Sequence, residues 1–292
     1  MARPLNLSAD QLRQWRTDGY TIARGLWSAD EVDACRSYFD HLATEADVSH
    51  LGDDVFAPER GHPDPLRAFP RVLHPHRFHD ASRAMLLDRR IEAALRALMG
   101  EQPVATQSMY YFKPPGGRGQ ALHQDNFYLA VENGTCIAAW TAIDPATPDN
   151  GGLYLVPGTQ GLDLQCPEIA DPEESFTTHY VRPPSGAQPV PAELTPGDVL
   201  FFNGSVVHGS RANTSDTWRR SFICHYAPAS ATAIHDWYHP TLNFDGTEHT
   251  GLARSRHGSP CGTEFPPMWP PDTFEAAEAA GLQPVKGGSV PR

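Results

Sequence analysis

Two His-x-Asp triplets in the sequence could each offer an imidazole and a carboxylate to one metal ion, at residues 62–64 and 123–125. The chain has 14 histidines and 35 acidic residues, so about two triplets of His-x-Asp or His-x-Glu would arise by chance. The flanking residues must therefore distinguish the two. His62 lies in the Pro-rich segment ERGHPDPL, which is typical of a loop. His123 lies in QALHQDNFYLAV, which predicts a strand, and on a strand His123 and Asp125 point to the same face.

A third ligand would complete the set of two histidines and one carboxylate that holds non-haem Fe(II) and leaves positions open for substrate and oxygen. The best candidate is His208, which follows a strand predicted at 198–202 and precedes Gly209. Eleven residues later, Arg219 opens another predicted strand, and the intervening ANTSD is turn-like, so the two strands are predicted to form a hairpin. A guanidinium binds a carboxylate with two hydrogen bonds, so Arg219 suits a 2-oxo dicarboxylate co-substrate.

The elements that must position these residues fall into three parts, which together predict a single domain over 1–292. The part at about 8–100 is mostly helical, with capping-box spacings at Ser8 and Ser28. The part at about 104–228 has short β-branched and aromatic runs between turns, which predicts an all-β sandwich or barrel. The part at about 229–292 is loop-rich. The finer predictions are a strand at 20–23, a loop at 46–80, a helix at 81–99 and a short helix at 272–280.

Composition limits the class of protein. A net charge of −12 argues against a nucleic-acid partner and against anionic membranes. The sequence has no apolar run long enough for a membrane span, and its start lacks the apolar core of a signal peptide, so a cytoplasmic location is expected. The five cysteines form no CxxC pair, which favours reduced thiols over a disulfide framework or a zinc site.

Several segments together carry a family resemblance. The run HQD, AWTAIDPATPDNGGLYLVPGTQ, HGS and RRS, with DGYTIARGLWSADEV and MYYFKPPGG before it, resembles the phytanoyl-CoA dioxygenase family of Fe(II)/2-oxoglutarate oxygenases. The resemblance covers roughly residues 8–228. It implies a mainly β fold, a cupin-like double-stranded β-helix or jelly roll, with flanking N-terminal helices. It also implies an oxidoreductase with Fe(II), and with 2-oxoglutarate and O₂ as co-substrates.

The resemblance also implies roles for individual residues. His123, Asp125 and His208 would bind iron, and Arg219 would hold the distal carboxylate of 2-oxoglutarate. Further co-substrate contacts are expected from residues that match family positions, namely Ser210, Trp140 and Gln107. Tyr111 is a further candidate, because it lies on the strand face of Gln107.

The expected reaction is hydroxylation or another oxidation of a small-molecule C–H bond, in secondary metabolism or small-metabolite modification. The family's halogenases replace the carboxylate ligand by a small residue, whereas this chain has Asp125. Ectoine hydroxylases carry an aromatic pair and an arginine where this chain has Ala121-Leu122 and Met109, which argues against ectoine. The alternatives are an acyl-CoA 2-hydroxylase of the same family, a cupin-like metal enzyme that needs no oxo acid, or a non-enzymatic metal-binding barrel.

Other conspicuous residues have simpler interpretations. The histidines of HPHRFHD, His74, His76 and His79, are expected in a solvated loop. His225 is expected to be a core or pocket-lining residue and not a ligand. Arg220 should face away from Arg219 and form a salt bridge, and Lys113 is expected at the base of a loop, where a rim contact with an anionic substrate is an alternative.

Overall fold

The computed structural model describes residues 6–45, 47–255, 273–286 and 290. The α-helices are α1 (Ala9–Asp18), α2 (Ala29–Leu42), α3 (Asp80–Leu86), α4 (Arg89–Met99), α5 (Asn126–Leu129) and α6 (Phe274–Ala279). The strands are β1 (Tyr20–Ala23), β2 (Val55–Phe56), β3 (Arg71–Leu73), β4 (Pro103–Tyr111), β5 (Gln120–His123), β6 (Ile137–Ala142), β7 (Leu153–Leu155), β8 (Glu168–Ile169), β9 (His179–Tyr180), β10 (Val190–Pro191), β11 (Val199–Asn203), β12 (His208–Ser210), β13 (Ser221–Pro228), β14 (Ala233–His235) and β15 (Ala253–Ser255). Short 3₁₀ helices are η1 (Ser49–Asp54), η2 (Pro65–Ala68), η3 (Pro75–Arg77) and η4 (Asp236–Tyr238).

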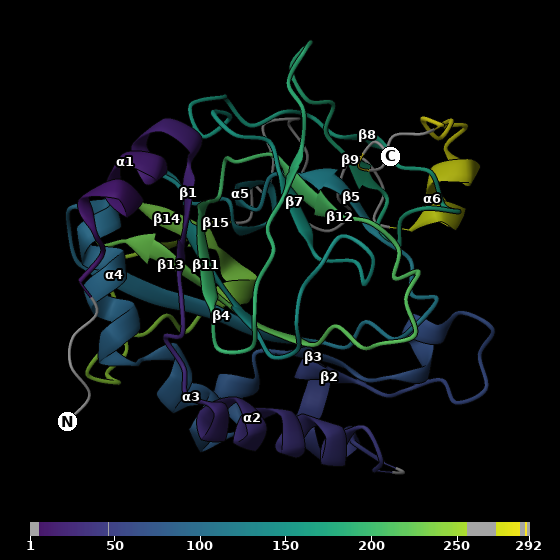
Figure 1. The fold of residues 1–292 in the computed structure, drawn as a ribbon, viewed down its shortest axis with the longest axis horizontal. Coiled ribbons are helices and arrows are strands. Elements are labelled where there is room, and N and C mark those ends of the chain that lie inside the picture. Colours follow the sequence, from purple (N-terminus) through teal and green to yellow (C-terminus); the bar gives the residue numbers. More distant parts are fainter. Residues whose placement is uncertain (1–5, 46, 256–272, 287–289, 291–292) are drawn as a thin grey trace.

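Two sheets form the body of the fold, as the sequence predicts. The larger has the order β1-β11-β6-β13-β4-β3-β2, and the smaller has the order β10-β7-β12-β5. Figure 1 shows α2 and α3 on one side of the long strands β4 and β13, with the smaller sheet on the other side. Strands adjacent in a sheet are mostly distant in sequence, and every pair within these two sheets is antiparallel. This is the predicted jelly roll, or double-stranded β-helix.

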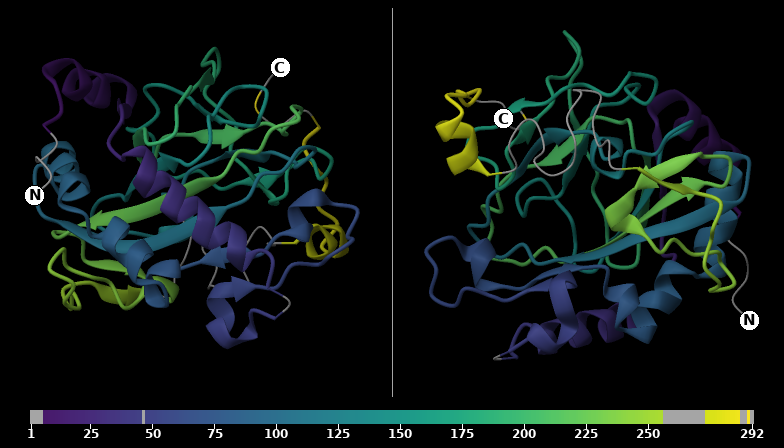
Figure 2. Two further views of the ribbon diagram at one scale, coloured as in Figure 1. Left: turned by 60° about the horizontal axis from the view of Figure 1, so that its bottom comes forward. Right: turned by 180° about the vertical axis from the view of Figure 1, so that it is seen from behind.

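The alternation of side chains along β13 separates the two hydrophobic layers. Phe222, Cys224 and Tyr226 pack into the core beneath the helices, whereas Ile223 packs into the core between the sheets. Figure 2 shows α2 lying across the strands of the larger sheet. Ile223 and the residues in phase with it, Ser221 and His225, therefore lie on the face toward the smaller sheet, and the chemistry of the site uses this face.

The N-terminal helices begin and end where the sequence indicates. Ser8 and Gln11 form a complete capping box at α1, and Ser28 and Glu31 form another at α2. The helix predicted at 81–99 is two helices, because Leu87 leaves the helical conformation and Asp88 caps α4. Gly100 then ends α4 with a left-handed backbone, φ 77°, that favours glycine.

Three local predictions are wrong because tertiary pairing overrides them. The segment 46–80, expected as a loop, contributes β2 and β3, which extend the edge of the larger sheet. The strand expected around 120–131 ends at His123, and α5 follows. The hairpin expected before Arg219 does not form, since β12 pairs with β5 and β7 while β13 pairs with β4 and β6. The chain thus crosses from one sheet to the other.

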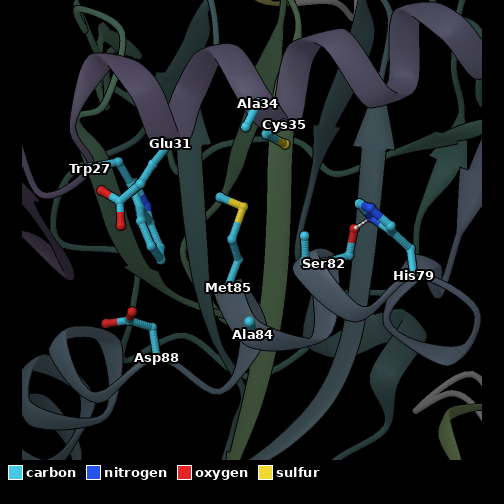
Figure 3. A pocket seen from close by; sticks show the side chains of 10 residues that line it. Trp27, Glu31, Ala34, Cys35, His79, Ser82, Ala84, Met85 and Asp88 are labelled. Carbon is cyan, nitrogen blue, oxygen red and sulfur yellow. Dashed lines mark hydrogen bonds between the residues drawn. The ribbon is translucent and has the colours of Figure 1, made fainter.

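The histidines of 74–79 are not a solvated loop either. His74 is fully buried, and His76 is buried with its Nδ1 2.7 Å from Ser108 Oγ. His79 stacks on Tyr38 at a centroid distance of 3.4 Å. It also lines a pocket between α2 and α3 whose other walls include Trp27 and Met85 (Figure 3). That pocket lies under the helices, on the face of the larger sheet opposite to Arg219.

The remaining predictions have mixed outcomes. The short C-terminal helix is present as α6, and residue 272, the first of the predicted span, lies outside the described residues.

Cys35, Cys136 and Cys224 are buried and free, but Cys166 is disulfide-bonded, contrary to the expectation of reduced thiols. Within the described part, no helix is long and apolar enough to cross a membrane. The single-domain assignment stays a prediction.

Candidate metal centre

His123, Asp125 and His208 come together where β5 and β12 pair. His208 lies directly opposite His123 in the register of these strands. A Cβ at Gly209 would lie 2.7 Å from the carbonyl oxygen of Gln120, so glycine at this position permits the close approach of the two strands. Asp125 sits just beyond β5 in a helical conformation, φ −62° and ψ −35°, which turns its side chain back toward His123.

The three side chains present one ligand atom each to a common point. Oδ1 of Asp125 lies 3.4 Å from Nε2 of His123 and 3.5 Å from Nε2 of His208. All three residues are buried, and their ligand atoms lie within 4.8 Å of one another. Among the residues that the structure describes, this is the group of His, Cys, Asp and Glu side chains that could hold a metal ion.

The hydrogen bonds of the two histidines leave the correct nitrogens available. Nδ1 of His123 is 2.8 Å from the carbonyl oxygen of Ala121, and Nδ1 of His208 is 2.9 Å from that of Val206. A carbonyl only accepts, so each Nδ1 carries a hydrogen, and in the neutral ring each Nε2 has a lone pair. Two imidazole lone pairs and a carboxylate oxygen are the donors of a facial Fe(II) site, so the residues fit iron.

The charges at the site also suit a cation. Burial opposes ionisation of Asp125, but His208 and His225 outweigh it and hold the pKa of this carboxyl well below its ordinary value. Burial and the neighbouring His208 lower the pKa of His123, which favours the neutral ring that a metal ligand needs. Burial lowers the pKa of His208, but Asp125 outweighs burial and raises this pKa above its ordinary value, so a proton and a metal ion compete for this ring.

The second His-x-Asp triplet forms no such site. Nδ1 of His62 accepts a hydrogen bond from the backbone N–H of Asp64 at 3.0 Å. The carboxylate of Asp64 caps η2 through the N–H of Leu66 and pairs with Arg118. The turn that the prolines predict is therefore stabilised by both members of this triplet.

Arg219 is a buried cation without a carboxylate partner among the described residues. Arg219 is 6% exposed and lies just before β13. Its backbone N–H and carbonyl oxygen form hydrogen bonds with the carbonyl oxygen and N–H of Lys113. Nη1 donates to Ser221 Oγ at 3.0 Å, and the guanidinium lies over the ring of Trp140 at 5.5 Å. Nε has no hydrogen-bond partner, and no carboxylate of the described residues forms an ion pair with Arg219. Burial lowers the pKa of Arg219 to about 10, so the guanidinium stays charged at neutral pH, and a buried charge of this kind favours an anionic ligand.

Ser210 and Lys113 lie beside this cation. Ser210 Oγ accepts hydrogen bonds from Lys113 Nζ at 2.9 Å and from the backbone N–H of Gln120 at 3.2 Å. Since the hydroxyl has two lone pairs and one hydrogen, its hydrogen is left to donate. Lys113 Nζ also donates to the carbonyl oxygens of Arg211 and Gly151. Burial and then Arg219 lower the pKa of Lys113 well below its ordinary value.

The other predicted contact residues lie on the same inner faces. Trp140 packs in the core between the sheets, together with Met109 and Tyr111. Tyr111 is half-buried, with its hydroxyl 3.6 Å from the sulfur of Met109. Gln107 is buried and lies opposite His225 in the register of β4 and β13. The structure therefore places all the predicted site residues along one side of the larger sheet and its facing strands.

The sequence analysis misjudged Lys113 and missed two contacts of the metal centre, those of His225 and Gln120. Lys113 is 2% exposed, so it is neither a simple loop-base residue nor a rim contact. His225 is buried, as expected, but its Nε2 lies 3.0 Å from Oδ2 of Asp125. The amide nitrogen of Gln120 lies 3.2 Å from Nε2 of His123. The sequence does predict that His225, six residues after Arg219, lies on the strand face of Arg219, but it gives no sign of the contact with Asp125. Arg220, in the opposite phase, pairs with Asp144 and Asp40 as predicted.

A buried lysine held by three oxygens should contribute strongly to stability. We expect Lys113→Met to lower the free energy of unfolding by about 2–4 kcal/mol, because it leaves buried acceptors without donors. The matched control is Lys286→Met, which removes the other lysine of the chain. Its side chain is 78% exposed and 3.8 Å from Asp171, so we expect less than about 1 kcal/mol. Urea unfolding of both variants measures the difference, and equal stability of the two would contradict this account.

Comparison with known proteins places the chain in a family. The family model for phytanoyl-CoA dioxygenase matches residues 15–221. The chain is 28% identical to phytanoyl-CoA dioxygenase domain-containing protein 1 of Mus musculus, over 80% of this chain and 96% of that protein. Two solved structures share the fold. EctD of S. alaskensis, solved with 2-oxoglutarate and 5-hydroxyectoine, has a TM-score of 0.63 at 22% identity and covers 88% of this chain and 86% of its own. The carbocyclase SnoK from nogalamycin biosynthesis has a TM-score of 0.60 at 23% identity, and the match covers 79% of this chain and 89% of SnoK.

The family match spans more than two thirds of the chain and includes the metal centre and Arg219. It confirms the family and the enzyme class that the sequence predicts. The chain therefore belongs to the phytanoyl-CoA dioxygenase family, and it is an oxygenase that depends on iron and 2-oxoglutarate.

Proposed function

We propose that His123, Asp125 and His208 bind Fe(II), and that Arg219 and Ser210 bind the distal carboxylate of 2-oxoglutarate, for the oxidation of a C–H bond in a small metabolite. When bound, iron and 2-oxoglutarate supply the activation of dioxygen, with release of succinate and carbon dioxide. The residues of the chain hold the reactants in position and keep water from them, since every residue named for these roles is buried.

The observation that carries the proposal is the buried guanidinium of Arg219, which has no ion-pair partner in the described part of the chain. A buried cation without an anion is costly, and a bidentate carboxylate would offset that cost. Ser210, two residues after His208, has a hydroxyl hydrogen left for the same carboxylate. A metal-binding barrel that uses no oxo acid would need the triad but would have no use for this pair.

The other residues expected to contact the co-substrate are Trp140, Gln107 and Tyr111, and each has a narrower proposed role. Trp140 lies against the guanidinium and would fix its plane toward the co-substrate. Gln107 and Tyr111 lie on the inner face of β4 and would complete the wall along the co-substrate.

For the primary substrate we propose a free small molecule, such as a secondary-metabolite intermediate, that reaches a cytoplasmic enzyme. A coenzyme A thioester carries phosphates that favour a basic rim. The chain has a net charge of −12, and Arg219 and Lys113, two basic side chains beside the site, are buried and form no such rim. The same acidity argues against a nucleic-acid partner or an anionic membrane surface.

A substrate panel tests the proposal. The purified protein is incubated with Fe(II), ascorbate and 2-oxoglutarate together with free polyketide-type aglycones, amino acids, or acyl-CoA thioesters with their free acids. We expect succinate release that increases with one of the free compounds, and a product heavier by one oxygen atom. Turnover of a thioester but not of its free acid would favour the acyl-CoA hydroxylase instead. A protein that binds neither metal nor 2-oxoglutarate would contradict the proposed function itself.

A further inference from the structure

Three imidazoles surround Asp125, and their hydrogen bonds divide them into two kinds. His123 and His208 donate from Nδ1 to backbone carbonyls and present lone pairs at Nε2. His225 presents its Nε2 to Oδ2 of Asp125 at 3.0 Å. An ionised carboxylate only accepts hydrogen bonds, so this nitrogen must carry a hydrogen. A protonated Nε2 cannot bind a metal ion, which separates His225 from the two candidate ligands.

His225 is buried, and a single polar contact orients its ring. It lies in the middle of β13, 2% exposed, with β4 on one side and β6 on the other. The hydroxyl of Thr106 donates to its carbonyl oxygen at 2.9 Å where the register of β4 and β13 shifts. Its Nδ1 has no hydrogen-bond partner among the described residues, so the carboxylate of Asp125 is the contact that orients the ring.

The two oxygens of Asp125 consequently face different partners. Oδ1 faces the Nε2 atoms of His123 and His208, and Oδ2 faces the N–H of His225. A carboxylate that binds a metal through both oxygens takes up two coordination positions. A hydrogen bond that engages Oδ2 would keep the carboxylate monodentate, so the triad would fill three positions of a bound metal ion and leave the others for co-substrate and oxygen.

We propose that His225 is a positioning residue that holds Oδ2 of Asp125 and reserves Oδ1 for the metal ion. This inference rests on the proposed metal triad. It assigns a role to a histidine that contacts a ligand and does not bind the metal itself. This role requires one N–H donor at the position of Nε2. Another side chain that places an N–H at the same distance from Oδ2 can therefore replace the imidazole.

The test measures metal affinity and coordination without turnover. His225→Phe and His225→Met remove the donor and keep an apolar side chain of similar size, whereas His225→Gln places an amide N–H at similar reach. We expect the first two to weaken Mn(II) binding about 10–100-fold, as loss of an outer-shell partner does, and the glutamine variant to stay within about threefold of the parent. With saturating Co(II), we expect the visible spectrum of the Phe or Met variant to shift toward higher coordination number, and that of the Gln variant to match the parent.

Two controls separate the possible failures. His76→Phe removes another buried histidine, one held by Ser108 on the other face of β4, and should leave Mn(II) binding unchanged. His208→Ala should abolish Mn(II) binding. Normal Mn(II) binding in that variant would contradict the proposed triad itself. If His208→Ala loses the metal while His225→Phe and His225→Met bind it like the parent, only the positioning role is wrong. An equal loss in the Gln variant would also overturn it, because the donor would then be irrelevant. If the Phe variant does not fold, the Met variant is compared with the Gln variant.

Discussion

His208→Ala and His123→Ala should each abolish iron binding and turnover while leaving the fold in place. Each substitution removes one of three ligands and leaves one imidazole lone pair and one carboxylate as donors, which is too few to hold Fe(II) against water. Both residues lie at the ends of short strands whose packing is apolar, so the loss of one ring should lower stability only modestly. Iron content after anaerobic loading and succinate release measure the effect, and circular dichroism checks the fold.

The control for this prediction is the other His-x-Asp triplet. His62→Ala removes an acceptor for the N–H of Asp64 in a surface turn and should change neither iron content nor turnover. Asp125→Gly extends the test to the carboxylate, and we expect it to stop hydroxylation because the charge that holds Fe(II) is lost. Full activity in the glycine variant, or equal loss in the His62 variant without unfolding, would show that the triad is assigned to the wrong residues.

Arg219→Ala should raise the apparent KM for 2-oxoglutarate about 30-fold or more, with iron content unchanged. Truncation of one partner of a buried guanidinium–carboxylate pair costs roughly 2–5 kcal/mol, and each 1.4 kcal/mol is tenfold in affinity. The geometry supports the upper part of this range, because Arg219 is buried and no described carboxylate can replace the co-substrate as its partner. Titration of the metal-loaded protein with 2-oxoglutarate measures the affinity directly.

Arg220→Ala is the matched control for Arg219→Ala. Its guanidinium faces the helical side of the sheet and pairs with Asp144 and Asp40. We expect this variant to lose about 1–3 kcal/mol of stability and to bind 2-oxoglutarate normally. The reverse result, with weak co-substrate binding in the Arg220 variant alone, would mean that the two arginines have exchanged roles. Normal affinity for 2-oxoglutarate in both variants would contradict the proposal that the protein binds 2-oxoglutarate through Arg219.

The sequence alone determined the parts of this protein that depend on short-range geometry. Capping boxes at Ser8 and Ser28 fix helix starts, because the hydrogen bonds involved join residues three apart. Strand alternation placed Arg219 and Arg220 on opposite faces, since that pattern is set within two residues. The choice of His123 over His62 also needed only local context, because the prolines around His62 already predict a turn.

Tertiary structure decided what depends on residues far apart in the chain. The segment between His208 and Arg219 looks like a hairpin turn, yet it crosses between sheets, because each flanking strand finds better partners in β4 to β7 than in the other. Burial of Lys113 and His74 follows from the packing of whole layers, which no window of neighbouring residues encodes. The contact of His225 with Asp125 joins residues 100 positions apart. The residue types of the site can be identified from the sequence, but only the paired sheets determine which of three histidines around one carboxylate offers a lone pair and which offers a hydrogen.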